Sequence, residues 1–362
     1  MNNFHVFHAG VNFRSYPFKE INILSNPIEN ASDDLLENTK RMIKTIKATN
    51  VILDSGGNTI FNREQKGKET TCDKAMPIIS DKGKINLTPH HVIEIARKLK
   101  PTAVVALDNP LQKKKNVLEK EMEFKKKLEI NIAWAKETVK MGEKDCPEVS
   151  VLVPIQASSF EQMETFLEAL SGLKISGVSL PIRNMGPRAL VLFLTRLQQL
   201  QISWVHVLGT TCFTNMAIAA FFARQGLFEV VSMDAMTWKE SAKFSGYLSP
   251  HNLCSHKINN ETVIEASIEN DCNCRYCKNV SFESIKEALY QERMLALCCH
   301  NSWVTESVAG ELYRNAGTLD QLANFMNHKS PKERKSPEAI DAIYAAEEMK
   351  DQNIRKLQLL LE

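Results

Sequence analysis

The sequence predicts an α/β protein, and a closed (β/α)8 barrel fits it best, with an open doubly wound sheet as the alternative. Three observations support this prediction. Between residues 50 and 236, six short apolar runs rich in β-formers alternate with longer amphipathic stretches. Polar residues stand where several of these runs end. The chain of 362 residues, 43% hydrophobic and 24% charged, is long enough to bury a full core.

The six apolar runs predict parallel strands, because each is followed by a helical pattern. They cover residues 50–57, 102–110, 149–158, 175–183, 203–211 and 229–236. Helix-start signals lie between them. Thr88 precedes a proline in TPHHVIEIARKLK, and Ser159 stands three positions before Gln162 in SFEQMETFLEALSGL. Each hydroxyl is therefore placed to cap a helix. The chain after His300 is also helical in pattern.

Polar or small residues occupy the carboxyl ends of five runs. They are Asp54, Asp108, Gln156, Gly209 and Asp234. In a barrel these ends share the face that carries the active site. A single aspartate there commonly caps a helix, but three carboxylates and an amide in matching positions favour a site. Paired carboxylates can divide a displacement at a sugar carbon between a nucleophile and a proton carrier. Gly56 and Gly57 allow the backbone to approach a ligand closely.

A second cluster lies in the stretch DCNCRYCKNV. It consists of Cys272, Cys274 and Cys277. This C-x-C-x-x-C spacing lets three thiolates converge on one Zn²⁺, which takes a fourth protein ligand in a structural site. His300 is the candidate, because an apolar helical period precedes it, while Cys298 and Cys299 could compete as ligands. Buried thiols without a metal are the alternative. A closed four-ligand site would hold the fold together and would not itself be catalytic.

Other features of the chain limit its location and partners. The start, MNNFHVFHAGVNFRS, does not resemble a signal peptide, and no run of about 18 apolar residues occurs, so we expect a cytoplasmic protein without a membrane partner. Nine cysteines in that compartment indicate free thiols and a metal site rather than disulfides. The net charge of +2 says little about partners. The lysine-rich segments 112–129 and 328–337 fit a solvated helix face and a polar linker, with a polyanion contact as the alternative.

Taken in order, several of these pieces resemble the tRNA-guanine transglycosylases. The pieces are LDSGG (53–57), LTP (87–89), ALDNP (106–110), PIQAS (154–158), LG (208–209), MDA (233–235), CNCRYC (272–277) and CHN around His300. They cover most of residues 50–301. The resemblance implies a TIM-like barrel with a zinc-binding insertion near its C-terminal end. It also implies exchange of a guanine in a polynucleotide for a 7-deazaguanine base.

The resemblance also implies a role for each site residue. Asp234 would attack the sugar C1′ and form a covalent glycosyl ester, and Asp54 would carry protons to and from the bases. Asp108 and Gln156 would hydrogen-bond the base edge, and the three glycines would line the base-binding site. The ligands of a structural Zn²⁺ would be Cys272, Cys274, Cys277 and His300. We expect residues 1–250 to form the first part of the catalytic barrel, 251–310 the zinc-binding subdomain and 311–362 a helical segment that closes the barrel or forms a tail.

The chain departs from the family pattern at three places. Asn58 stands where an aromatic residue is usual, and Pro181 and Ile182 stand where Gly-Gly is usual. The sequence DAMTWKESAKFSGYL lacks the arginine-rich stretch that follows the nucleophile and grips tRNA. We therefore favour DNA over tRNA as the polymer. Trp238, Lys239 and Lys243 are the candidates to contact it, although Trp238 fits the core equally well.

Three other functions compete with DNA base exchange. The first is the same exchange on tRNA, and the second is a non-catalytic accessory subunit. Because both Asp54 and Asp234 are present, the sequence disfavours the second. The third is an unrelated metal-dependent barrel hydrolase, which needs histidines at strand ends, and only His206 lies inside a predicted strand. The expected partners are a nucleic acid, a 7-deazaguanine base and either a second copy of the chain or a partner subunit.

Overall fold

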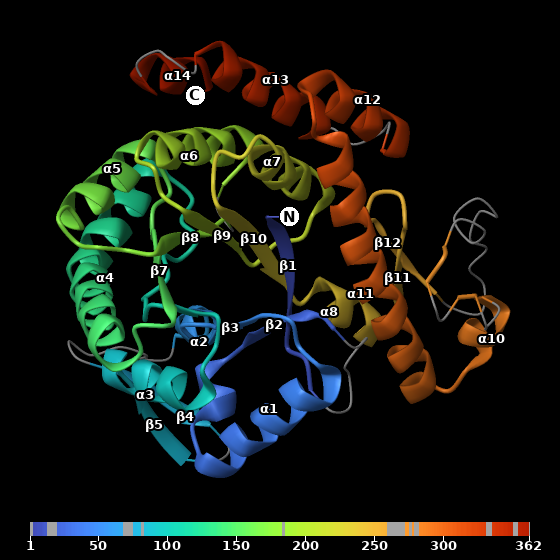
Figure 1. The fold of residues 1–362 in the computed structure, drawn as a ribbon, viewed down its shortest axis with the longest axis horizontal. Coiled ribbons are helices and arrows are strands. Elements are labelled where there is room, and N and C mark those ends of the chain that lie inside the picture. Colours follow the sequence, from blue (N-terminus) through green and yellow to red (C-terminus); the bar gives the residue numbers. More distant parts are fainter. Residues whose placement is uncertain are drawn as a thin grey trace.

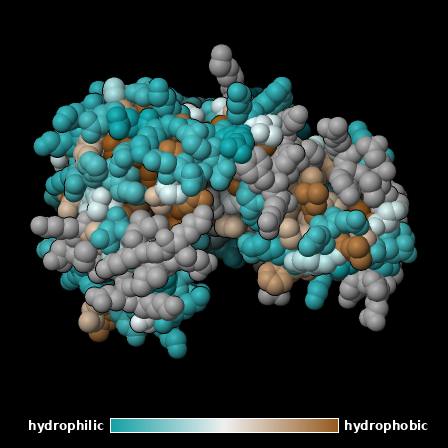
Figure 2. Space-filling model, turned by 90° about the horizontal axis from the view of Figure 1, so that it is seen from below, coloured by the Kyte–Doolittle hydropathy of each residue, from teal (hydrophilic) through white to brown (hydrophobic). Residues whose placement is uncertain are grey.

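The structure is a computed structural model, and it describes most of the chain. The described residues are 3–12, 20–67, 75–80, 83–182, 185–258, 272–274, 277–278, 282–330, 335–349 and 354–361. Within them, no helix is both long enough and apolar enough to span a lipid bilayer. The face shown in Figure 2 is largely hydrophilic, with hydrophobic residues interspersed among the hydrophilic ones.

Eight parallel strands close into a barrel in the order β1-β10-β9-β8-β7-β6-β3-β2 (Figure 1). They are β1 (Phe4–Ala9), β2 (Asn22–Ser25), β3 (Val51–Leu53), β6 (Ala103–Val105), β7 (Ser150–Pro154), β8 (Gly177–Pro181), β9 (Trp204–Leu208) and β10 (Val230–Ala235). The pairing of β1 with both β10 and β2 closes the sheet, so the predicted barrel is confirmed and the open sheet is excluded. The sequence prediction identified six of these strands and missed β1 and β2.

Helices surround the barrel (Figure 1). They are α1 (Asp33–Ile46), α2 (Gly57–Glu64), α3 (Pro89–Leu99), α4 (Val117–Asp145), α5 (Phe160–Ala169), α6 (Pro187–Gln199), α7 (Phe213–Arg224) and α8 (Thr237–Lys243), with a 3-10 turn η1 (Pro27–Asn30) before α1. The predicted caps are present. Thr88 accepts a hydrogen bond from the backbone of His91, and Ser159 accepts one from Gln162, which fixes where α3 and α5 begin.

Two small antiparallel hairpins and five further helices complete the described chain. They are β4 (Met76–Ser80) with β5 (Gly83–Leu87), β11 (Gly246–Leu248) with β12 (Ser255–Lys257), α10 (Phe282–Glu287), α11 (Tyr290–Asn315), α12 (Leu319–Lys329), α13 (Lys335–Glu348) and α14 (Ile354–Leu361). Helix α11 packs on α7 and α8, and α13 packs on α6 and α7 (Figure 1). The expected boundary at residue 310 falls inside α11, and the division into three regions stays a prediction.

The interior of the barrel is filled by side chains. Phe7, Ile52, Val105 and Leu152 belong to a buried apolar cluster contributed by four different strands. Alternate residues of each strand point inward and fill the barrel interior, so a ligand cannot pass through it. A binding site must therefore lie at an end of the barrel, such as the end where the strands finish. The fold therefore places the residues that follow β3, β6, β7 and β9, and those at the end of β10, around one mouth.

Candidate active site and metal cluster

A pocket of about 740 Å³ opens at the carboxyl ends of the barrel strands. Six of the seven residues predicted for catalysis or base binding line it, although they are spread over 181 positions of sequence. They are Asp54, Gly57, Asp108, Gln156, Gly209 and Asp234. The barrel brings them together because parallel strands in a closed sheet all end on the same face. Asn58 and Pro181, two of the departures from the family pattern, also line the pocket.

The double glycine forms the turn from β3 into α2. Gly56 has φ +84°, a backbone conformation that costs other residues free energy, so glycine is favoured there. A Cβ on Gly57 would stand 2.6 Å from Asp108 Oδ1 and 2.9 Å from Pro110 Cγ. Gly57 therefore allows the start of α2 to pack directly against the Asp108 carboxylate. Gly56 itself lies outside the pocket lining, where it shapes the turn.

Asp54 has an unusual protonation state. Burial, together with the negative charges of Asp234 and Asp108, raises the pKa of its carboxyl group to about 7, against the opposing effect of the backbone N–H groups of Ser55 and Gly56. A carboxyl group of this kind is partly protonated near neutral pH. It can therefore donate a proton to a leaving group and recover one afterwards.

Asp108 and Gln156 form a hydrogen-bonded pair on one wall of the pocket. Gln156 Nε2 donates to Asp108 Oδ2, and Gln156 Oε1 accepts from the backbone N–H of Leu111 over 3.1 Å. Both side chains are buried. The carboxylate accepts and the amide both donates and accepts, so the pair offers the polar pattern needed to read the edge of a purine base.

Asp234 lies across the pocket at the end of β10. Its Oδ1 accepts a hydrogen bond from the backbone N–H of Gly209 over 2.9 Å. The Nε2 atom of His206, on the neighbouring strand β9, lies 3.3 Å from the same oxygen. Asp234 is therefore held through one carboxylate oxygen at the face that lines the pocket.

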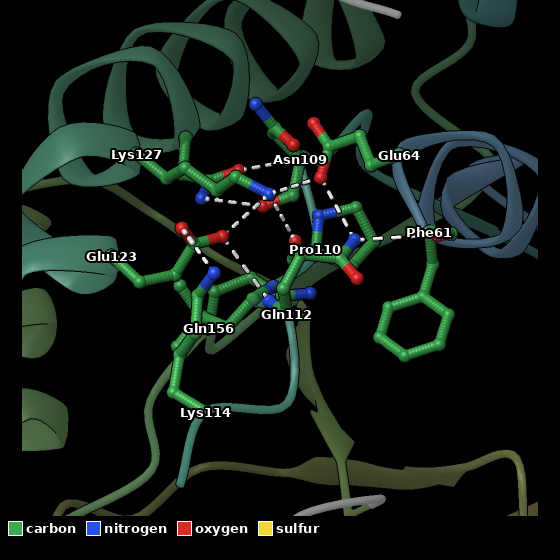
Figure 3. Close-up of polar contacts among 11 residues, drawn as sticks. Phe61, Glu64, Asn109, Pro110, Gln112, Lys114, Glu123, Lys127 and Gln156 are labelled. Atoms are coloured by element: carbon green, nitrogen blue, oxygen red, sulfur yellow. Dashed lines mark hydrogen bonds and ion pairs between the residues drawn. The ribbon is translucent and has the colours of Figure 1, made fainter. Parts of the chain in front are cut away.

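Beside the pocket, a buried lysine fixes the loop that carries Asp108 (Figure 3). Lys127 points from α4 to the carbonyl oxygen of Pro110, 2.6 Å away, and to Glu64 Oε2 at the end of α2, also 2.6 Å away. Its Nζ also lies 2.9 Å from Glu123 Oε1. Burial alone would raise the pKa of Glu123, but the hydrogen bond and the charge of Lys127 hold it below its usual range.

Side-chain amides complete this network. Gln112 Nε2 donates to Glu64 Oε2 over 2.8 Å, and its backbone N–H donates to Glu123 Oε1 over 3.2 Å. Asn131 of α4 pairs with both backbone groups of Asn109. Figure 3 shows Glu64 of α2 and Glu123 and Lys127 of α4 converging on the loop that contains Pro110 and Gln112. Sequence reasoning missed Lys127 and Asn131, since nothing in the helix pattern distinguishes a buried lysine from its exposed neighbours.

Lys127→Met is expected to destabilise the protein by about 1–3 kcal/mol, because it removes a buried cation from two partly buried carboxylates, Glu64 and Glu123. The change should also raise the KM for the base, since the loop carrying Asp108 and supporting Gln156 loses its anchor. Denaturant unfolding and steady-state kinetics measure the two effects. Lys125→Met is the matched control: this exposed lysine of the same helix forms a surface ion pair with Glu121, and its loss should cost less than about 1 kcal/mol. Equal effects of the two substitutions would contradict the role of Lys127.

The three predicted cysteines and His300 come together in a separate buried cluster. Their ligand atoms all lie within 4.8 Å of one another, so the group can hold a metal ion. His300 Nδ1 lies 3.2 Å from Cys272 Sγ, 3.7 Å from Cys274 Sγ and 3.4 Å from Cys277 Sγ. Three thiolates and an imidazole are a donor set that suits Zn²⁺. Among the described residues this is the one group found that could bind a metal, and it includes neither Cys298 nor Cys299.

The surroundings of the cluster orient its histidine. His300 Nε2 lies 2.8 Å from the carbonyl oxygen of Leu248 and donates to it, so Nδ1 is left to face the sulfurs. The ring of Tyr247 stacks on the imidazole at 3.7 Å. Asn301 bonds the backbone of Leu248, Gly246 and Trp238, which ties α11 to β11 and α8. These contacts favour a structural role. None of the four ligands lines the described pocket, which disfavours a metal-dependent hydrolase.

Of the three residues after Asp234 that were predicted to contact the polymer, two are buried and the third forms an ion pair within the protein. Trp238 is buried and donates its indole N–H to the carbonyl oxygen of Ala9, so it belongs to the core and offers no stacking surface. Lys239 is buried too, with Nζ 2.5 Å from the carbonyl oxygen of Gly10. Lys243 pairs with Glu240. The prediction of a stacking residue and a phosphate contact at Trp238 and Lys239 is wrong, because α8 turns these side chains toward β1.

Part of the chain matches a known protein family. Residues 20–188, just under half of the chain, match the model of the family described as queuine tRNA-ribosyltransferase. The matched segment includes Asp54, Asp108 and Gln156, whereas Asp234 and the metal cluster lie beyond it. A search of curated proteins found no match.

Proposed function

The match over residues 20–188 identifies the chain as a member of the tRNA-guanine transglycosylase family, and from this premise we propose that it exchanges a guanine in DNA for a 7-deazaguanine base through a covalent Asp234 ester. The family is one of glycosyltransferases that act on guanine in a nucleic acid. The observation that carries the proposal is the convergence of Asp54, Asp108, Gln156 and Asp234 on one pocket.

The proposed reaction divides its chemistry among these groups. One carboxylate oxygen of Asp234 attacks C1′ of the nucleotide, the bond from C1′ to the guanine nitrogen breaks, and the base leaves with the electron pair. Asp54, whose pKa is raised to about 7, gives the departing base a proton. The incoming base returns a proton to Asp54 and displaces Asp234 from C1′. The Asp108 and Gln156 pair holds the base edge during both halves.

A structural Zn²⁺ fits the second cluster, in which Cys272, Cys274, Cys277 and His300 would be its ligands. The ion would fix the three cysteines against His300 of α11. The reaction needs no further cofactor, because one glycosidic bond replaces another.

One feature supports DNA over tRNA, and a pair of lysines offers phosphate contacts that either polymer can use. The segment after Asp234 lacks the arginine-rich stretch that grips tRNA in the family, and α8 occupies its place with two inward-facing side chains. Exposed lysines stand instead at 113 and 115, just after Leu111 of the pocket lining, where they can meet phosphate groups. A DNA substrate also removes the need to read a 2′-hydroxyl group.

The test is uptake of labelled guanine by duplex DNA, single-stranded DNA and tRNA in parallel. We expect label in DNA to exceed label in tRNA, and uptake to fall steeply as salt rises, because phosphate contacts dominate binding. Single-stranded DNA should react fastest, since taking an unpaired base out of its stack costs least. Label in tRNA alone would favour tRNA exchange, and no label in any polymer would favour the accessory subunit.

A further inference from the structure

Below the pocket, the barrel interior holds a short polar chain on β9 and β10. Trp204 Nε1 donates to Ser232 Oγ over 2.8 Å, and Ser232 Oγ lies 2.8 Å from His206 Nδ1. His206 Nε2 then lies 3.3 Å from Asp234 Oδ1. Ser232 and His206 are directly opposite in the pairing of the two strands, and both are fully buried. The chain therefore runs from the barrel interior to the carboxylate at the pocket floor.

The partners of His206 decide where its proton lies. An indole N–H can only donate, so Ser232 Oγ is free to donate its own proton to His206 Nδ1. The neutral ring then carries its proton on Nε2. The opposite tautomer would set a ring lone pair 3.3 Å from the lone pairs of an ionised Asp234, which is repulsive. A charged ring would also have a proton on Nε2. In either case the proton lies on Nε2, the ring nitrogen that is 3.3 Å from Asp234 Oδ1.

We propose that His206 is a positioning residue for the nucleophile: in the reacting complex its Nε2–H joins the N–H of Gly209 on Asp234 Oδ1, which leaves Oδ2 as the oxygen that attacks C1′. This inference rests on the proposed function. As the bond from Oδ2 to C1′ forms and the guanine leaves with its electron pair, Oδ1 becomes the carbonyl oxygen of the ester. Both N–H groups can stay on it throughout, so the carboxylate keeps its orientation in both halves of the exchange.

The contact between His206 and Asp234 does not have hydrogen-bond geometry in this structure, since Nε2 has no hydrogen-bond partner among the described residues. Catalytic hydrogen bonds are often long or poorly aligned without substrate and tighten in the reacting complex. The neighbouring strand supplies a comparison. Ser179 of β8 lies directly opposite His206 on its other side and is fully buried, and within the described part of the chain its Oγ has no hydrogen-bond partner either. The polar chain therefore runs through Ser232 and not through Ser179.

The test compares two substitutions of equal length that differ in one donor. His206→Met removes the N–H, and His206→Gln keeps an amide N–H at the same distance from the backbone. We expect single-turnover formation of the protein–DNA adduct to slow on the order of 100-fold in His206→Met, as when a reacting group is displaced by about 1 Å from its productive geometry. His206→Gln should restore most of the rate. The KM for DNA should stay the same in both, because His206 lies beneath the pocket floor.

Controls separate positioning from folding. Ser232→Ala should slow adduct formation, because it releases Nδ1, whereas Ser179→Ala should leave the rate unchanged. This pair tests the proposal even if His206→Met fails to fold. An unchanged rate in His206→Met, equal losses in His206→Met and His206→Gln, or equal rates in the two serine variants would overturn it. If the wild-type protein forms no adduct with any polymer, the proposed function itself fails, so the two failures are distinguishable.

Discussion

Asp234→Asn is expected to abolish base exchange, with a loss of about 10⁴-fold or more, as when the nucleophile of other covalent enzymes is removed. The amide matches the carboxylate in shape and can still accept the N–H of Gly209 through its oxygen. It is a far weaker nucleophile, so no glycosyl ester should form. Denaturing electrophoresis of protein incubated with labelled polymer measures the adduct. Persistence of the adduct in this variant would transfer the role to another group, and Asp108, at an equivalent strand end, would be tested next.

Substitution of Asp54 tests a different step of the reaction, because its expected defect is in proton transfer to the leaving base. Burial, Asp234 and Asp108 raise the pKa of Asp54 to about 7, so the carboxyl group is protonated below that pH and ionised above it. Since the leaving guanine needs the proton, adduct formation in wild type should fall about tenfold per pH unit above 7. Asp54→Asn should be slow at every pH while binding the polymer normally. A rate that is the same at pH 6 and pH 9 would contradict this role.

Loss of the metal should have the second large effect. We expect close to one zinc per chain, and Cys274→Ser should abolish tight binding, because Cys274 is fully buried and its Sγ also accepts the backbone N–H of Cys277. When free zinc is at 1,000 times its Kd, zinc binding stabilises the folded protein by about 4 kcal/mol, and the variant should lose this stabilisation. The loosening should reach the barrel, since α11 carries His300 and packs on α7 and α8. Elemental analysis and thermal unfolding measure the two effects.

Two variants make the metal test specific. Cys212→Ser changes an exposed cysteine outside the cluster and should keep full zinc content and stability. His300→Ala should lose zinc, because its Nδ1 is the one nitrogen among the four ligand atoms. Full occupancy in His300→Ala would implicate Cys298 or Cys299 as the fourth ligand. A wild-type protein that folds equally well after chelation would contradict a structural metal.

The sequence predicted the β-α alternation well where the strands are apolar and bounded by turn residues. The missing strands show its limits. β1 contains two histidines in six residues, and β2 has only four residues, so neither has the pattern of an apolar strand. Both are nonetheless required to close the barrel, because β1 pairs with β10 and β2 pairs with β3. Closure is a property of strand pairing across the whole chain, which no local window contains.

By itself, the sequence determined the parallel sheet, the residues at the strand ends and the three cysteines with His300 as a candidate metal group. These features depend on local periodicity and spacing, because the regular geometry of strands, helices and turns fixes where residues at a given spacing lie. Only the tertiary structure decided which polar side chains act together. Trp238 and Lys239 face β1, Lys127 is buried between α2 and α4, and His206 lies beneath Asp234. Each of these placements depends on contacts between elements far apart in the chain, because burial and partners are fixed by packing rather than by neighbours in sequence.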